Sequence, residues 1–79
     1  MNLEQSYLND VLILIIERAI IAKNEIKDEN SSDEERSFNE GRALAYYEVV
    51  STFLGQAAAF GLTSDIIPAL TFNAEKELL

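Results

Sequence analysis

Apolar residues recur at intervals of three and four along the first third of the chain, where there is neither proline nor glycine. This spacing places them on one side of an α-helix, because successive residues turn by about 100° around the helix axis. We therefore predict a helix from about residue 3 to residue 27. Its regular apolar stripe consists of Leu8, Leu12, Ile15, Ala19, Ala22 and Ile26.

A polar turn, residues 28–32, separates this helix from a second one that we predict over about residues 33–60. Ser32 or Asp33 is suited to cap the first turn, and Ser32 with Glu35 fits the capping-box pattern. Gly61 is suited to follow the last turn, since glycine adopts the left-handed conformation without a steric penalty. The apolar stripe of this helix consists of Ala43, Tyr46, Tyr47, Val50, Phe53, Leu54 and Ala57.

The last segment, residues 61–79, contains the only proline, Pro68, which tends to break any helix that precedes it. We predict a short turn that starts at Thr63 or Ser64, and one last helical turn after an Asn73 cap. Two long helices joined by a short turn form an antiparallel hairpin. The predicted fold class is all-α: one domain, residues 1–79, formed by a two-helix hairpin with a short C-terminal helical segment.

The stretch from Val11 to Ile21 is apolar on almost every side, so one neighbouring helix cannot cover it. Leaving such side chains in water forfeits on the order of 1.5–3 kcal/mol for each large aliphatic. We therefore expect two hairpins to pair as a homodimeric four-helix bundle. The alternative is a monomer whose tail, residues 66–72, folds back over one flank. The expected dimer interface consists of Ile13, Leu14, Ile16, Ile20, Ile21, Tyr46, Phe53 and Phe60.

Small residues line the second helix on the side opposite its apolar stripe. Gly41, Ala45, Thr52 and Gly55 lie there, with Glu48 among them. Small side chains let another backbone approach closely, so these five residues are a candidate surface for a protein partner. The alternative interpretation, which we favour slightly, is an ordinary solvated face.

The charge balance narrows the choice of partners. Fourteen acidic residues against six basic ones give a net charge of -8, which repels polyanions. We therefore expect no direct binding to nucleic acid or to an anionic membrane. The apolar run of residues 11–16 is far shorter than the roughly 20 residues that span a bilayer. Residues 1–10 carry acids and no base, unlike the start of a signal peptide, so we expect a cytoplasmic protein.

This chain lacks the residues on which most catalytic mechanisms depend. Without histidine or cysteine there is no imidazole base, no thiol nucleophile and no structural zinc site. Glu17 and Glu48 are the best candidates for a carboxylate metal site, but bundle sites of that kind use Glu-x-x-His motifs. The acidic residues 28–35 lack the glycine of a calcium loop. We expect no enzymatic activity, no cofactor and no metal ligands.

The segment FNEGRALAYYEVVSTFLGQAAAFGL, Phe38 to Leu62, resembles small uncharacterised helical-hairpin proteins of Gram-positive bacteria and of their phages and mobile elements. In those proteins a Gly-Arg pair, here Gly41–Arg42, precedes a Tyr-Tyr-Glu, and the pattern ends at Ala-Phe-Gly. The resemblance covers about a third of the chain. It implies a helical hairpin and a mobile-element context, and no activity.

Together these features favour a small acidic, non-catalytic protein that acts as a helical homodimer by binding another protein, as an adaptor or regulator. Two alternatives stay open at this stage. One is a phage or mobile-element inhibitor of a host protein, whose acidic surface imitates nucleic acid. The other is a bundle that binds a metal through carboxylates.

Overall fold

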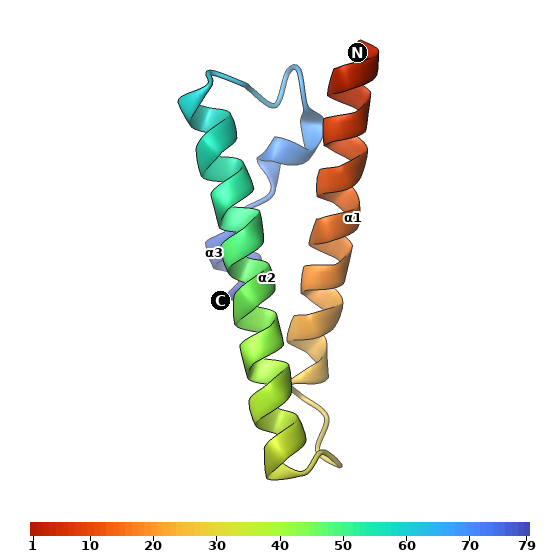
Figure 1. Cartoon of the computed structure of the whole chain (residues 1–79), viewed down its shortest axis with the longest axis vertical. Helices are drawn as coiled ribbons and strands as arrows, with labels where there is room; N and C mark the ends of the chain where they lie inside the picture. Colours follow the sequence, from red (N-terminus) through yellow and green to blue (C-terminus); the bar gives the residue numbers. More distant parts are fainter.

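The computed structural model describes all 79 residues, and its only regular secondary structure is helical (Figure 1). The helices are α1 (Leu3–Glu25), α2 (Asp33–Ala59), the 3-10 helix η1 (Pro68–Thr71) and α3 (Ala74–Leu78). The two long helices run antiparallel and pack against each other, which confirms the predicted all-α hairpin with a short C-terminal helical segment. The molecule is elongated, with extents of 45 × 20 × 16 Å.

The caps set where the first helix begins. The Asn2 side chain accepts a hydrogen bond from the Gln5 N–H at 2.8 Å, and the Gln5 side chain accepts one from the Asn2 N–H at 3.0 Å. This reciprocal capping box satisfies two backbone donors that the first turn would otherwise leave unpaired. Helix α1 ends at Glu25, two residues earlier than its predicted end.

Both predicted ends of α2 are confirmed. Ser32 Oγ accepts a hydrogen bond from the Glu35 N–H at 3.2 Å. At the other end Gly61 has a φ of 75°, and the Leu62 N–H donates to the Ala57 carbonyl at 3.0 Å. These two features form a Schellman motif, which turns the chain sharply away from the helix axis.

The segment after α2, residues 62–79, returns along one side of the hairpin, behind the two long helices in Figure 1. Two hydrogen bonds hold this tail against α1, one near its middle and one near its C-terminus. The side chain of the buried Asn9 accepts a hydrogen bond from the Ala69 N–H at 2.9 Å, and Lys23 Nζ donates to the Glu77 carbonyl at 3.0 Å. Ile67 is fully buried. The tail therefore does fold back, as in the alternative prediction, and adds a third layer.

The core lies between the hairpin and this tail. It consists of Leu12, Ile16, Ala19, Val50, Ala74 and Leu78. We expected Ile16 on an outer flank, in a dimer interface, and that placement is wrong because its side chain is 9% exposed. Ile16 is seven residues from both Asn9 and Lys23, which is close to two helical turns, so the three share one side of α1. The tail covers that side.

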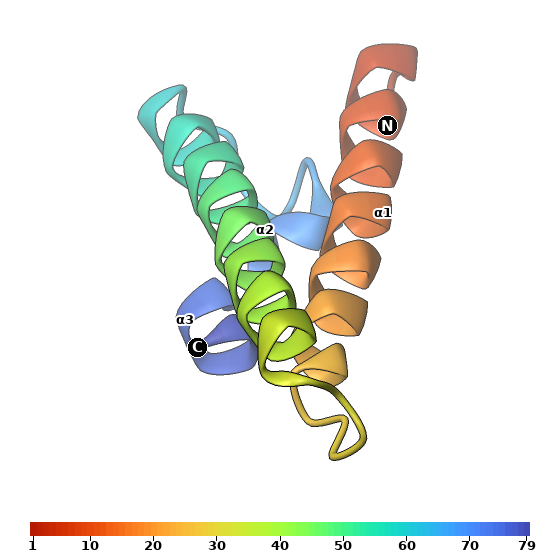
Figure 2. The ribbon, with the colours of Figure 1, turned by 60° about the horizontal axis from the view of Figure 1, so that its bottom comes forward.

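The two long helices lie closest near the turn that joins them, and they diverge toward the opposite end of the hairpin (Figure 2). Near the turn the buried residues between them are small, namely Ala19, Ala22 and Ala43. Toward the diverging end the contacts involve larger side chains such as Leu8 and Phe53. The small side chains near the turn let the two helices approach closely there.

Candidate functional site

One side of the hairpin has no covering layer. Lys23 of α1 and Ala58 of α2 both lie beside the tail. Leu14 and Val49 are each nine residues away from those positions, which is two and a half helical turns, so they lie on the opposite side. Both are at least half exposed.

We call this uncovered side the open face. Its apolar side chains are exposed or half-buried, and they come from both long helices. They are Leu3, Tyr7, Leu14, Ile21, Phe38, Val49, Phe53 and Phe60. Phe60 and Leu3 are the most exposed of them, at 76% and 82%. Large apolar side chains gathered on one side of a small protein make that side a candidate interaction surface.

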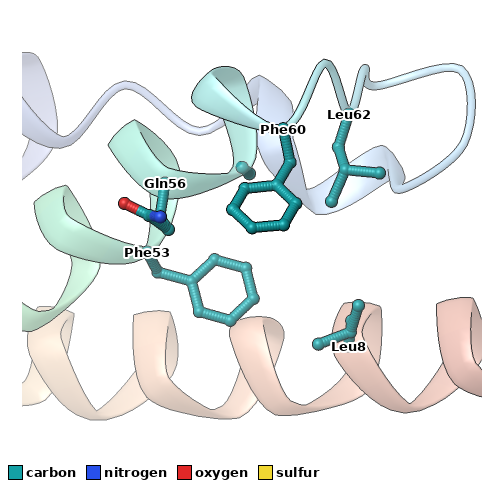
Figure 3. A pocket seen from close by; sticks show the side chains of 6 residues that line it. Leu8, Phe53, Gln56, Phe60 and Leu62 are labelled. Atoms are coloured by element: carbon teal, nitrogen blue, oxygen red, sulfur yellow. The ribbon is translucent and has the colours of Figure 1, made fainter.

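Three shallow hollows follow one another along the open face. The central one, about 260 Å³, lies between the long helices, and Figure 3 shows the Phe53 and Phe60 rings beside Leu8 within it. It shares Leu8 with a hollow lined by Leu3 and Tyr7, and it shares Phe53 with a third hollow beside Val49. The shared residues show that the three hollows form one apolar track.

Charged groups of both signs border the open face, and Glu4 and Glu48 each line one of the outer hollows. Arg18 is exposed near the middle of this face. Arg42 donates to the Glu25 carboxylate at 2.7 Å and lies over the Tyr46 ring, 5.5 Å from its centroid. An exposed ion pair of this kind contributes little stability, about 0–1 kcal/mol. The open face therefore carries both acidic and basic groups around its apolar side chains.

The structure divides the predicted dimer-interface residues among three places. Leu14, Ile21, Phe53 and Phe60 lie together on the open face, and Tyr46 packs against the core at its edge. Ile13 and Ile20 lie on another side of α1 and are 39% and 38% exposed. Ile16 is buried under the tail, as described above.

Four residues that the predicted set did not contain also lie on the open face, namely Leu3, Tyr7, Phe38 and Val49. The sequence already indicates two of them, because at 100° per residue Leu3 and Tyr7 fall on the same flank of the helix as Leu14 and Ile21. Nothing comparable distinguishes Val49 from other apolar positions of α2.

The small-residue surface predicted on α2 is exposed at Gly41, Ala45, Glu48, Thr52 and Gly55. A Cβ added at either glycine would have no atom of the chain within 4 Å outside its own helical turn. Ala45, Glu48 and Thr52 line the third hollow. The surface therefore borders the open face, and no other part of the chain packs on it.

The acidic side chains considered as possible metal ligands do not lie close together. Glu17 and Glu48 are both exposed, and no three acidic side chains gather closely enough to hold a metal ion. Neither long helix combines the length and the apolar character required to cross a bilayer.

Comparisons with family models, with curated proteins and with solved structures found no match to this chain. The resemblance of residues 38–62 to helical-hairpin proteins of mobile elements stays a prediction.

Proposed function

We propose that this chain is a non-catalytic protein-binding module that pairs with a second copy of itself through the open face, forming a four-helix bundle. The observation that carries the proposal is an excess of surface. A folded monomer of this mass exposes roughly 4,800 Å², whereas this chain exposes 5495 Å². The excess, roughly 700 Å², is close to the ~800 Å² that each partner contributes to a standard interface.

The shape supports the same conclusion. The radius of gyration is 14.3 Å, against roughly 12 Å for a compact domain of this length. Packing two elongated hairpins face to face gives each long helix a second long neighbour, and it produces a thicker, more compact particle. Two-fold pairing is also the commonest symmetry among soluble oligomers.

The energetic gain comes from the apolar track. Leu14 is 56% exposed, so burying the rest of it is worth about half of the roughly 1.5–3 kcal/mol of a fully exposed leucine, and the two-fold symmetry counts this gain twice. The neighbouring aromatic rings, Phe53 and Phe60, add contacts of the kind enriched at interface centres. Glu4 and Glu48 line the outer hollows, so this gain requires that the two carboxylates stay solvated at the edge of the interface.

Light scattering and sedimentation equilibrium test the pairing directly. The wild-type chain is expected at about twice 8.8 kDa at micromolar concentration. Leu14→Glu is expected to weaken the dimer by at least about a hundredfold, because two copies of the lost apolar contact and two buried charges act together.

Leu44→Glu is the matched control. Leu44 is 53% exposed, close to the 56% of Leu14, but it lies on a side of α2 away from the open face. This variant should keep the dimeric mass. A monomeric wild-type chain, or equal loss of mass in both variants, would contradict the proposal.

A further inference from the structure

The charges of this molecule are segregated along its long axis. Residues 25–40, at the turn end of the hairpin, hold seven of the fourteen acids and only two of the six bases. That end therefore carries a net five of the eight excess negative charges. The apolar track occupies the remaining length of the open face, from Leu3 to Ile21 along α1.

Two symmetric arrangements bring one open face onto another. In the first, α1 of each copy packs across α2 of its partner, and both turn ends lie at the same end of the bundle. In the second, α1 packs antiparallel on the partner's α1, and the turn ends lie at opposite ends.

The charge distribution distinguishes them. In the first arrangement the two turn ends are separated by one helix–helix spacing, about 8–10 Å, which is only about one Debye length at physiological salt. In the second they are separated by roughly the length of α2, about 40 Å. Cross-pairing of Glu25 with the partner's Arg42 would offset little in the first arrangement, because these two residues already form an ion pair within each chain.

We infer that the partner on the open face is a second copy in the antiparallel arrangement, with α1 against α1 and Leu14 nearest the two-fold axis. This inference rests on the proposed function. A residue n of α1 then lies level with residue 28 minus n of its partner. Tyr7 comes level with the partner's Ile21. Arg18, which has no ion pair within its own chain, comes level with the partner's Asp10.

Cysteine cross-linking reads this register directly, because the wild-type chain contains no cysteine. Leu14→Cys is expected to form a covalent dimer on mild oxidation, since antiparallel helices bring the two Cα atoms near the axis within disulfide range. Tyr7→Cys and Ile21→Cys alone should stay uncross-linked, and an exchanged mixture of the two should link. Leu44→Cys is the control that should not link.

The mass of each variant before oxidation separates the two proposals. A dimeric mass with no Leu14→Cys link, or with a link between Tyr7→Cys and Phe60→Cys chains instead, overturns the antiparallel register and leaves the dimer in place. A monomeric mass overturns both.

A charge exchange provides a second readout that needs no cross-link. Asp10→Arg or Arg18→Asp alone is expected to raise the dimer Kd by up to about thirtyfold, because the two-fold axis repeats the pair and each exposed ion pair contributes up to about 1 kcal/mol. The double variant should recover most of the wild-type affinity, because the pairing is restored across the axis. Asp10 and Arg18 are eight residues apart in one helix, too far to pair within it. Additive weakening in the double variant would overturn the predicted pairing.

Discussion

The covered side and the open face belong to the same two helices, but their apolar side chains are buried on the first and exposed on the second. On the covered side, Leu12 and Val50 are fully buried beneath residues 62–79. On the open face, Leu14 and Val49 have similar chemistry and are at least half exposed. Leu12 and Val50 belong to the stripes through which the two helices face each other, and the tail residues Ala74 and Leu78 complete their covering. Leu14 and Val49 point to the other side of the hairpin, which the tail, a single layer, does not cover.

This contrast shows how a short chain distributes a limited amount of covering surface. A two-helix hairpin has two apolar sides, and an 18-residue tail supplies enough apolar side chains for one. A domain of this size buries a smaller fraction of its surface than larger ones do. The second side is therefore available to another molecule, and a second copy is the partner that we propose.

The comparison is sharpest for two leucines that are two residues apart. Leu12→Ala is expected to lower the free energy of unfolding by about 2–5 kcal/mol at any protein concentration, because it leaves a cavity in the core. Leu14→Ala should have a smaller effect that grows with protein concentration, since it acts on the dimer. Urea unfolding at two concentrations measures both. Equal, concentration-independent losses would show that the two sides are equivalent.

The polar anchor of the tail gives a smaller effect. Asn9→Ala is expected to cost about 1–3 kcal/mol, because it leaves the Ala69 N–H without the acceptor that it has in the partly buried contact with Asn9. Asn24→Ala, at an exposed position of the same helix, is the control and should change stability little. Thermal unfolding compares them. An Asn9 variant as stable as the control would mean that apolar contacts alone hold the tail.

The glycines of α2 give the smallest effect, and one of opposite sign. Gly41→Ala and Gly55→Ala are each expected to stabilise the chain by about 0.5–1 kcal/mol, since alanine is the better helix former and meets no atom there. Gly61→Ala should destabilise it, because its φ of 75° is strained for alanine. Thermal unfolding checks the signs. Stabilised Gly41 and Gly55 variants with weakened self-association would show that a partner backbone contacts this surface.

Local signals in the sequence predicted the helical elements well. Ser32, Gly61 and Asn73 stand at or beside the helix ends where their capping chemistry placed them. Caps depend on a few neighbouring residues, so local sequence is sufficient to identify them. The apolar stripes likewise predicted which sides of α1 and α2 face each other.

Reasoning from the sequence predicted the residues of the open face less completely. The apolar excess of residues 11–21 correctly indicated that the hairpin partner could not cover α1 by itself. Periodicity does not tell which flank the tail takes, and Ile16 was therefore placed on the wrong side. Ile13 and Ile20 were included with Leu14 and Ile21 in the predicted interface, although the helical spacing already puts the two pairs on opposite flanks of the apolar stripe. The structure places the two pairs on different sides of the helix.

What the sequence determined by itself is the set of elements: two long helices, their caps, a short helical tail, and more apolar surface than a hairpin can enclose. The tertiary structure decided where the tail packs and hence which residues form the open face. The physical reason is the sequence separation over which each interaction acts. Helix formation and capping depend on residues within one or two turns, whereas the contact of Ala69 with Asn9 joins positions 60 residues apart, and no local pattern specifies it.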